Sequence, residues 1–343
     1  MKIESNMKEL RKMTLGVETF PPGVLEWIAK ENLWNLWVPK VYGGLEMSLA
    51  EGLKKLKDLA RVDGSLGWTV TLCSGANYFI GNLQNEVARQ IFGQPDIPVC
   101  FGGSGYVGGT AEMHGDHYEI SGLWRYATGA PYLTHFTLNA KITENGKSLR
   151  NEDNSPLVRS FLIPRKDVHI IEDWNAMGLK ASATHSFEVK KILVNKKYSF
   201  IYNEVYLPQA IFKIDFSVFA ALTLWVNYIG LAEHFLEEVR ANSTRINFSL
   251  LELAITGSNK QVTRFAKASE KVINEESEFL KSFGQDIYKE AGESIRSLTR
   301  EIIKIYPLLG IKASKINIPL NQVFRDYFTA TQHHIFTKAT TSV

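Results

Sequence analysis

The chain has 343 residues, of which 45% are hydrophobic and 22% are charged, and its 39 basic and 36 acidic residues give a net charge of +3. This length exceeds one ordinary hydrophobic core and suits two or three packed units. The nearly balanced charge argues against a nucleic-acid-binding surface. The two cysteines, Cys73 and Cys100, form neither a disulfide framework nor a zinc-binding pattern.

The first 95 residues have the periodicity of helices. Residues 25–38 place apolar side chains three and four positions apart, and residues 48–63 repeat this pattern with lysines on the opposite face. Further helices are expected over residues 65–83 and 85–92. We therefore predict an N-terminal helical domain over residues 1–95. Its charged start lacks the apolar run of a signal peptide, so we expect a soluble, cytoplasmic protein.

After residue 95 the sequence pattern changes from that of helices to that of strands. Short alternating or β-rich runs occur at residues 117–129, 135–142, 158–164 and 185–194, and turn residues separate them. This pattern predicts a central antiparallel β-barrel or sandwich over residues 96–205.

Helical periodicity returns for the rest of the chain, residues 206–343. Four segments, 212–243, 248–283, 284–306 and 319–338, predict a four-helix bundle. The most apolar stretch, residues 216–232, is short for a membrane span and carries Ser217, Thr223 and Asn227. We therefore expect a buried bundle helix and no membrane partner. The fold class predicted from the residues is multidomain α+β.

A glycine-rich stretch follows the apolar run at residues 97–101. Residues 103–108 match GxGxxG, the pattern of dinucleotide-binding folds. That motif requires a helix directly after it, whereas a turn at Gly115 and then a strand follow here. We interpret the stretch as a turn between strands, or as a loop whose bare backbone approaches a ligand closely.

Four segments in order resemble the acyl-CoA dehydrogenase superfamily of flavoproteins. They are residues 38–68, with a P-x-x-Y-G-G turn and a D-x-S-x-G-W break, residues 122–129 (GLWRYATG), residues 173–189 (DWNAMGLKASATHSFEV), and residues 324–334 (FRDYFTATQHH). The resemblance covers nearly the whole chain. It implies that superfamily's fold: an N-terminal helical domain, a central β domain and a C-terminal four-helix bundle.

The resemblance also implies a flavin, FAD or FMN, between the β domain and the bundle. A flavin needs hydrogen bonds at its polar edge and an apolar or aromatic wall. The residues expected to bind it are Ser104, Tyr126, Ala127, Thr128, Gly129, Trp174, Ser182, Thr184 and Arg325. Without the resemblance, Trp124 and Tyr126 are equally typical of a strand core. Trp174, Ser182 and Thr184 are then typical of a surface turn. Asn77 and Tyr78, on the second long helix, are the expected substrate contacts.

The end of the chain distinguishes two branches of the superfamily. Acyl-CoA dehydrogenases need a carboxylate base, and one subgroup places a glutamate eight residues after the aspartate of its Arg-Asp pair. Here His334 occupies that position. Another subgroup takes the glutamate from an earlier bundle helix. We interpret the glutamates of that helix here as a solvated face; they are Glu233, Glu237 and Glu238.

The flavin-dependent monooxygenase branch ends in R-D-x₆-H, and Arg325, Asp326 and His333 match this spacing. A histidine beside a reduced flavin that reacts with oxygen can donate a proton or deprotonate a phenolic substrate. We therefore assign His333 and His334 as the catalytic residues. The alternative is a histidine pair that caps or lines the end of the bundle.

These features together predict a flavin-dependent monooxygenase that hydroxylates an apolar or aromatic small molecule with reduced flavin and oxygen. A flavin reductase would be its partner. One alternative is an acyl-CoA dehydrogenase with bound FAD that oxidises an acyl thioester and passes electrons to an electron-transfer flavoprotein. Another is a redox-inactive relative that binds a small molecule. The resemblance implies a homodimer or homotetramer assembled through the bundle, and no metal is expected.

Overall fold

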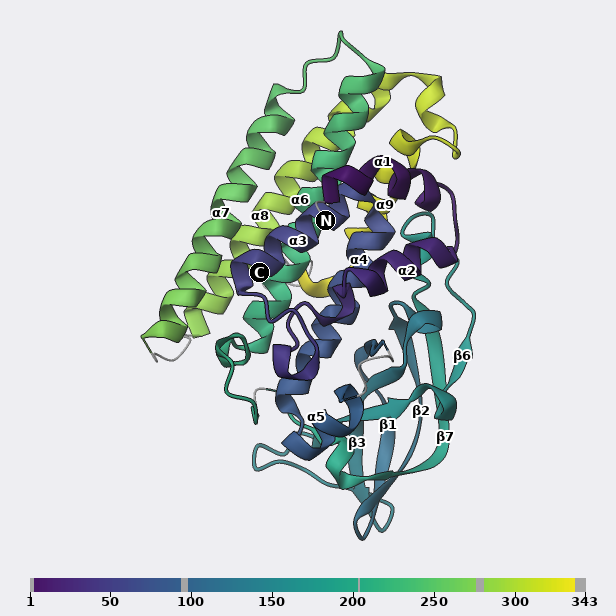
Figure 1. Cartoon of the computed structure of the whole chain (residues 1–343), viewed down its shortest axis with the longest axis vertical. Helices are drawn as coiled ribbons and strands as arrows, with labels where there is room; N and C mark the ends of the chain where they lie inside the picture. The colour runs from purple at the N-terminus through teal and green to yellow at the C-terminus, as the bar shows by residue number, and fades with distance from the viewer. Residues whose placement is uncertain (1–2, 94–97, 203, 276–280, 337–343) are drawn as a thin grey trace.

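The computed structural model describes residues 3–93, 98–202, 204–275 and 281–336. Five helices come first, and in Figure 1 α1 and α3 lie against the long C-terminal helices while α5 lies next to the sheet. They are α1 (Ile3–Thr14), α2 (Pro22–Lys30), α3 (Leu49–Val62), α4 (Gly64–Asn77) and α5 (Asn85–Phe92). The apolar periodicity of residues 48–63 and 85–92 therefore predicted α3 and α5 closely.

One aspartate separates α3 from α4. Asp63 has an extended backbone conformation, which ends α3, and its side chain accepts a hydrogen bond from the Leu66 backbone N–H at the start of α4. Ser48 and Glu51 form a reciprocal capping box at the start of α3. These caps fix both ends of α3 and the direction in which α4 leaves it.

Strands form one sheet of eight strands in the order β6-β7-β2-β1-β3-β5-β8, with β4 paired to β3. They are β1 (Phe101–His114), β2 (His117–Ala127), β3 (His135–Glu144), β4 (Lys147–Ser148), β5 (Val158–Pro164), β6 (His169–Ile171), β7 (His185–Asn195) and β8 (Ser199–Phe200). Most pairs are antiparallel, as expected, but β1 and β3 run parallel. Parallel pairing follows because the chain crosses from β2 to the far side of β1.

The glycine-rich stretch lies within β1 and is not a turn, which corrects the first interpretation. A Cβ on Gly109 or Gly122, which face each other across β1 and β2, would lie 2.7 Å from the Trp124 indole. Trp124 is fully buried and donates a hydrogen bond from Nε1 to the Asn139 carbonyl at 2.9 Å. The glycines therefore make room for this tryptophan and for the closely approaching strands.

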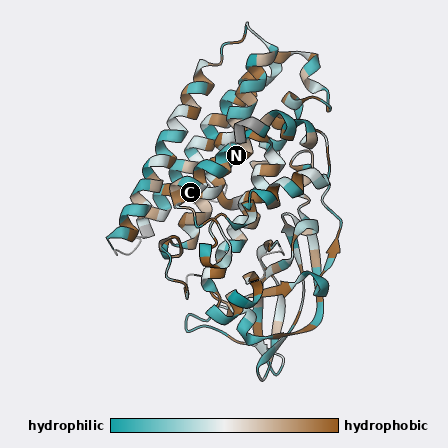
Figure 2. Ribbon diagram, in the orientation of Figure 1, coloured by the Kyte–Doolittle hydropathy of each residue, from teal (hydrophilic) through white to brown (hydrophobic). Residues whose placement is uncertain are grey.

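Four helices complete the chain: α6 (Phe216–Asn242), α7 (Ser249–Asn274), α8 (Lys281–Ile305) and α9 (Pro319–Ala330). Of the helices in the described ranges, α6 alone is long and apolar enough to cross a membrane, and 78% of its most apolar window is buried inside the protein. It contacts α3, α4, α7, α8 and α9, which is the central position expected for a bundle helix. Figure 2 shows hydrophobic and hydrophilic residues alternating along the outer helices, as one buried face requires.

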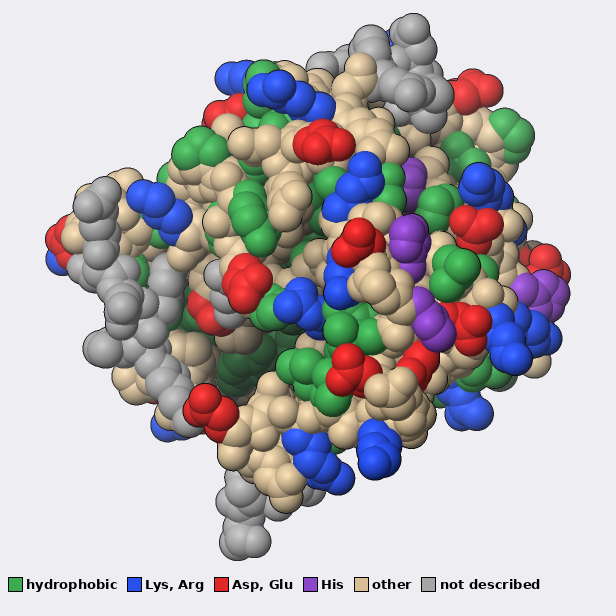
Figure 3. Space-filling view, turned by 90° about the horizontal axis from the view of Figure 1, so that it is seen from below, with side chains coloured by type: hydrophobic (Ala, Val, Ile, Leu, Met, Phe, Trp, Pro, Cys, Tyr) green, Lys and Arg blue, Asp and Glu red, His purple; other side chains and the backbone are tan. Residues whose placement is uncertain are grey.

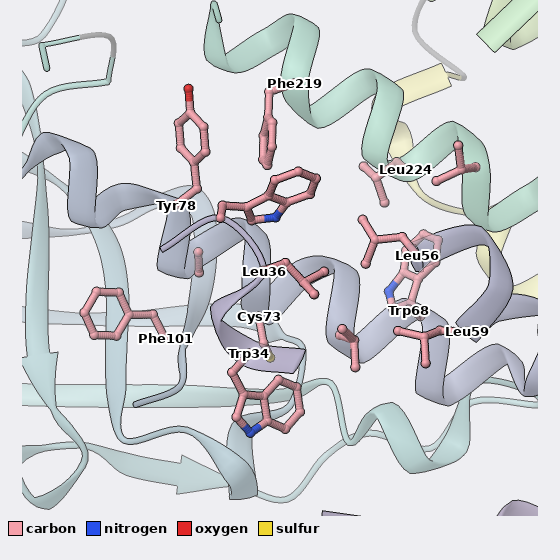
Figure 4. Close-up of a cluster of buried hydrophobic side chains, with 14 of the residues drawn as sticks. Trp34, Leu36, Leu56, Leu59, Trp68, Cys73, Tyr78, Phe101, Phe219 and Leu224 are labelled. Atoms are coloured by element: carbon pink, nitrogen blue, oxygen red, sulfur yellow. The ribbon is translucent and has the colours of Figure 1, made fainter. Parts of the chain in front are cut away.

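The hydrophobic core runs without a break from the N-terminal helices into the bundle. Figure 4 shows part of it along α4, where Tyr78 lies beside Phe219 and Trp68 lies beside Leu56 and Leu59. The surface of the β region differs from this apolar core. Figure 3 shows acidic, basic and histidine side chains interspersed on the face seen from below. This surface mixture fits the near-zero balance of charges.

Candidate functional site

A sharp corner forms where β2 ends. The pairing of β2 with β7 shifts register between Trp124 and Ala127, and Tyr126 adopts φ +65° with 67% of its side chain exposed. Gly129 follows at φ +77°, and its N–H donates to the Ser182 carbonyl at 2.7 Å. A left-handed backbone conformation is unfavourable for tyrosine. The surrounding structure therefore holds the backbone of Tyr126 in this conformation.

Three hydroxyl groups gather behind this corner. Thr128 and Thr184 lie 3.1 Å apart at their Oγ1 atoms, and Ser182 Oγ lies 2.8 Å from Thr184 Oγ1. All three residues are buried. Ser182 Oγ also donates to the Leu179 carbonyl at 2.6 Å. The structure therefore brings the predicted residues Thr128 and Gly129 together with Ser182 and Thr184 through direct hydrogen bonds, and Ala127 pairs with His185 in β7.

Trp174 belongs to the same assembly. Its indole Nε1–H donates to the Leu179 carbonyl at 3.0 Å, and its backbone N–H donates to His185 Nδ1 at 3.0 Å. We call residues 172–184, which carry these contacts and include the predicted flavin contacts Trp174, Ser182 and Thr184, the flavin-side segment. Trp174 is partly exposed, which leaves an aromatic surface beside the hydroxyl cluster.

Helix α4 forms a wall shared by the corner and the C-terminal segment. A Cβ on Gly129 would lie 2.8 Å from Cys73 Sγ and 3.3 Å from the Thr69 methyl, so glycine is required for this close approach. On the neighbouring face of α4, the Trp68 indole meets the His333 imidazole edge to face, with ring centroids 5.5 Å apart. The hydroxyl cluster and His333 are thus connected through one turn of α4.

His333 follows the end of α9. It is partly buried, and its Nδ1 accepts a hydrogen bond from the Ile335 N–H at 3.4 Å. It borders a cavity of about 550 Å³ between α6, α8 and the C-terminal segment. The apolar lining includes Tyr228, Ile295 and Phe336, and the basic lining includes Arg296, Arg300 and Lys304. The side chain of His334 lies outside the described part of the chain.

Arg325 connects α9 to the flavin-side segment. Its Nε donates to Asn321 Oδ1 at 2.8 Å, and its Nη1 donates to the Met177 carbonyl. A third bond runs from Nη2 to the Ile316 carbonyl at 3.3 Å. These bonds give Arg325 a structural task beside the site. Ser104, also predicted to bind flavin, lies in β1, and its Oγ accepts from the Tyr106 N–H at 3.3 Å.

The structure argues against Asn77 and Tyr78 as substrate contacts. Asn77 Nδ2 donates to Asn35 Oδ1 at 2.7 Å and to the Val99 carbonyl at 2.9 Å, while its Oδ1 accepts from the Phe101 N–H at 2.6 Å. Tyr78 is buried, and its hydroxyl lies 3.0 Å from the carbonyls of Ile211 and Ile214. Both side chains link α4 to its neighbours and have no exposed polar atom to offer a ligand.

The glutamates of α6 form ion pairs and do not make the solvated face that we expected. Glu233 pairs with Lys57 at 3.0 Å, and Glu237 pairs with Arg11 at 2.6 Å. Although burial opposes it, the guanidinium groups of Arg11 and Arg61 hold the pKa of Glu237 below its ordinary value. A catalytic base needs a raised pKa, so Glu237 does not suit the dehydrogenase reaction.

Sequence reasoning missed Trp68, Tyr228 and Asp63. Trp68 and Asp63 stand in the D-x-S-x-G-W segment that carries the resemblance, so this motif was the available signal. Tyr228 gave no signal, because it lies in a uniformly apolar helix. Its ring lies 6.2 Å from Trp68 and 5.9 Å from Phe336, and its hydroxyl donates to the Ala330 carbonyl at 2.7 Å.

Comparison with known proteins finds relatives of this chain among monooxygenases. The chain is 26% identical to an indole-3-acetate monooxygenase of Acinetobacter baumannii, over 92% of this chain and 84% of that protein. It is 28% identical to an indole-3-acetate monooxygenase of Pseudomonas putida, over 63% of this chain and 54% of that protein. No family model matches the chain.

Solved structures agree with the predicted architecture. The 3-HSA hydroxylase from Rhodococcus sp. RHA1 superposes with a TM-score of 0.89 at 17% identity, covering 97% of this chain and 92% of that one. XiaF from Streptomyces sp., solved with FADH2 and glycerol, superposes with a TM-score of 0.85 at 19% identity, covering 97% and 90%. The predicted acyl-CoA dehydrogenase fold is confirmed. The chain therefore has the fold of these two proteins and is related in sequence to monooxygenases.

Proposed function

We propose that this chain is the oxygenase component of a two-component flavin-dependent monooxygenase. It takes reduced FAD or FMN from a partner flavin reductase and hydroxylates an aromatic small molecule with oxygen. The observation that carries the proposal is the edge-to-face contact of His333 with Trp68, on the helix that also touches the hydroxyl cluster. His334, the next residue in the chain, occupies the position at which a dehydrogenase subgroup has its carboxylate.

The residues at the corner fit a flavin. Tyr126 exposes an aromatic ring, Gly129 lets the corner pack closely against α4, and three buried hydroxyls cluster behind the corner. When bound, reduced flavin would supply the electrons that activate oxygen. Thr128, Ser182 and Thr184 would orient its polar edge, while Tyr126 and Trp174 would form its wall. XiaF was solved with FADH2, and TdsC from Paenibacillus sp. A11-2 was solved with FMN and indole.

His333 holds or moves a proton in this scheme. Its Nδ1 accepts from the Ile335 N–H, which assigns the ring proton to Nε2 in the neutral form. The Trp68 edge and the Ile335 bond together fix the orientation of the imidazole. His333 would then donate a proton near the reacting oxygen or accept one from a phenolic substrate. His334 remains a second candidate for the same role.

The cavity beside His333 suits an aromatic substrate that carries an anionic group. Tyr228, Ile295 and Phe336 provide apolar surface, and Arg296, Arg300 and Lys304 follow one face of α8. Glu301 pairs with Arg300 at 3.2 Å and with Lys304 at 2.9 Å, whereas no ion pair among the described residues includes Arg296. The two relatives named above are named for indole-3-acetate, an aromatic carboxylate.

Arg296→Gln tests this substrate assignment. We expect the KM for an aromatic carboxylate to rise roughly tenfold, because one charge-assisted contact is lost, while the KM for its neutral amide stays constant. Lys12→Gln, at the end of α1, is the matched control and should change neither value. An equal rise in the KM values of acid and amide in Arg296→Gln would show that the cavity does not recognise the anionic group.

Two alternatives predict different behaviour. An acyl-CoA dehydrogenase with bound FAD and an electron-transfer flavoprotein as acceptor would reduce its flavin with an acyl thioester in the absence of oxygen. The ion pairs of Glu233 and Glu237 disfavour this reaction. A redox-inactive relative would bind neither oxidised nor reduced flavin.

Assembly through the bundle belongs to the same proposal. Leu250 and Leu253 on α7 are 59% and 68% exposed, and Ile303 on α8 is 51% exposed. Such apolar positions on the outer helices suit a homodimer or homotetramer. Light scattering of the purified protein would measure the state directly. A monomer at micromolar concentration would contradict this part of the proposal.

Anaerobic titration of the purified protein with oxidised and reduced FAD and FMN tests the function. We expect tight binding of at least one reduced flavin and, on mixing with oxygen, a transient flavin absorbance that aromatic substrate shortens. Absence of binding to every flavin form would overturn both enzyme hypotheses. Reduction of bound flavin by an acyl thioester would favour the dehydrogenase.

A further inference from the structure

A pair of buried aspartates lies directly behind the flavin-side segment. Asp326, on α9, is 3% exposed, and Asp63, between α3 and α4, is 2% exposed. Two glycines give Asp326 its place. A Cβ on Gly64 would lie 2.7 Å from Asp326 Cβ, and a Cβ on Gly178 would lie 2.5 Å from the Asp326 backbone nitrogen. Asp326 is therefore inserted between the α3–α4 junction and the flavin-side segment.

The two carboxyl groups of the pair are bonded unequally. Asp63 accepts from the Leu66 N–H and from Gln322 Nε2, both at 2.8 Å. Asp326 Oδ1 accepts from the Leu179 N–H at 2.6 Å. Its Oδ2 is buried with no hydrogen-bond partner among the described residues. An ionised carboxylate in that environment would leave a charged oxygen unsolvated, which is strongly unfavourable.

Among the described residues, nearby cations do not form ion pairs with the two aspartates. Burial raises the pKa of Asp63 as well as that of Asp326, and this effect is larger than the lowering by His234 at Asp63 and by Arg325 at Asp326. Arg325 is adjacent in sequence, but its guanidinium binds Asn321 and the carbonyls of Met177 and Ile316. His234 on α6 faces Asp63, and Glu238 lies 3.7 Å from His234 Nε2. A Cβ on Gly64, the residue next to Asp63, would lie 2.8 Å from Asp326 Oδ2, so the two carboxyl groups are neighbours. Two neighbouring carboxyl groups in a buried site, without a paired cation, favour a state in which one of them keeps its proton.

We propose that Asp326 is a positioning residue, which holds the flavin-side segment through Leu179 in its neutral, protonated form, with the Asp63 carboxylate keeping that proton in place. Leu179 connects this bond to the site, because its carbonyl accepts from both Ser182 Oγ and Trp174 Nε1. The inference rests on the proposed function, since it assigns a task to residues that adjoin the flavin in that proposal.

The direction of the pH dependence follows from burial. Burial, and then the neighbouring Asp63, raise the pKa of Asp326 to about 8, from an ordinary value of 3.8. A carboxyl whose folded pKa is raised stabilises the fold fully below its unfolded pKa and loses that contribution as pH rises through the folded value. Above about pH 8 Asp326 ionises, the two carboxylates repel each other, and the flavin-side segment loosens.

Amide hydrogen exchange of the flavin-free protein is the first test. We expect peptides that cover residues 175–185 to lose protection between pH 7 and pH 9, after correction for the intrinsic exchange rate. Asp326→Asn keeps the side-chain oxygen that accepts from Leu179 but cannot ionise, so it should remove this pH dependence. Asp63→Asn should move the loss to lower pH, because the Asp63 carboxylate that keeps the proton on Asp326 is then gone and less negative charge opposes ionisation.

Asp173 offers a matched control in the same segment. It accepts from the Ser186 N–H at 2.7 Å and from the Ser186 hydroxyl at 2.6 Å. Although partial burial opposes it, these two bonds hold the pKa of Asp173 below its ordinary value. Asp173→Asn should therefore reduce protection by the same factor at every pH and keep the wild-type pH profile.

Flavin affinity is the second test. The affinity of wild-type protein for reduced flavin should fall on the order of tenfold between pH 7 and pH 9, and that of Asp326→Asn should stay constant. Identical pH profiles of wild type and Asp326→Asn, in exchange and in affinity, would overturn the proposal. If Asp326→Asn does not fold, an unshifted exchange profile in Asp63→Asn would overturn it instead. Loss of flavin binding at all pH values, with the exchange result intact, would refute only the proposed function.

Discussion

Helix α4 has two ends with opposite character. At its C-terminal end, Asn77 and Tyr78 are buried and their polar atoms are hydrogen-bonded to the neighbouring backbone and to Asn35. At its N-terminal end, Asp326 packs against Gly64, next to Asp63, and Thr69 Oγ1 is buried without a partner among the described residues. Trp68, between Asp63 and Thr69, contacts His333.

This difference in hydrogen bonding assigns a structural role to one end of α4 and a functional role to the other. Buried polar groups with complete hydrogen bonds stabilise a fold, and leaving them unpaired costs free energy. Where a native protein tolerates unpaired or proton-sharing groups, the position commonly serves a ligand or a reaction. The C-terminal end of α4 is therefore a structural joint, and the N-terminal end belongs to the site.

Asn77→Leu should produce the largest effect. It leaves the Val99 carbonyl, the Phe101 N–H and Asn35 Oδ1 without their partner, and three such losses amount to about 4 kcal/mol of unfolding free energy. Urea denaturation of the flavin-free protein measures it. Asn242→Leu, at the exposed end of α6, is the control and should change the value by about 0.5 kcal/mol or less. A comparable loss of unfolding free energy in the two variants would contradict the structural role of Asn77.

His333→Ala should leave the free energy of unfolding nearly unchanged and lower the hydroxylation rate about 100-fold, the usual contribution of a positioned acid or base. Product formation under saturating reduced flavin measures the rate. His117→Ala, at the exposed start of β2, serves as the control for loss of an imidazole. An unaltered rate in His333→Ala would take this residue out of the reaction and shift attention to His334.

Tyr78→Phe sharpens the contrast from the structural end. It removes the hydroxyl near the Ile211 and Ile214 carbonyls but keeps the ring stacked on Phe219, so we expect a loss of about 1–2 kcal/mol of unfolding free energy. Flavin affinity and turnover should stay at wild-type values. A changed KM in Tyr78→Phe, measured at constant stability, would restore the substrate role that the structure argues against.

Thr69→Val should have the smallest overall effect, with little change in stability. Valine replaces a buried hydroxyl that has no partner among the described residues, so the unfolding free energy should stay within about 1 kcal/mol of wild type. If the hydroxyl serves a flavin next to Gly129, affinity for reduced flavin should fall a few-fold, which calorimetry can measure. A large loss of stability would show that Thr69 has a structural partner and that the two ends of α4 are alike.

Much of the fold was predictable because apolar periodicity records which face of each element is buried. The spacing of leucines marked α3, and the prediction of helices at 248–283 and 319–338 anticipated the starts of α7 and α9. The site was predictable only in part. Thr128, Ser182 and Thr184 lie in segments with recognisable motifs and contact one another in the structure, while their binding of a flavin stays a prediction.

The remainder depends on contacts between residues far apart in the chain. In the sequence, Gly64 and Gly178 have the pattern of ordinary turn residues. In the structure, both positions require glycine because Asp326 packs against them. The glycines of β1 resemble a nucleotide loop, but they leave space for Trp124.

The sequence by itself determined the order of helices and strands, the imidazole in place of a carboxylate, and the resemblance to flavoproteins. Only the tertiary structure decided which polar groups are saturated, as at Asn77, and which are left with an unpaired oxygen among the described residues, as at Asp326. Hydrogen-bond partners and burial are properties of the packed molecule, and no local pattern along the chain encodes them.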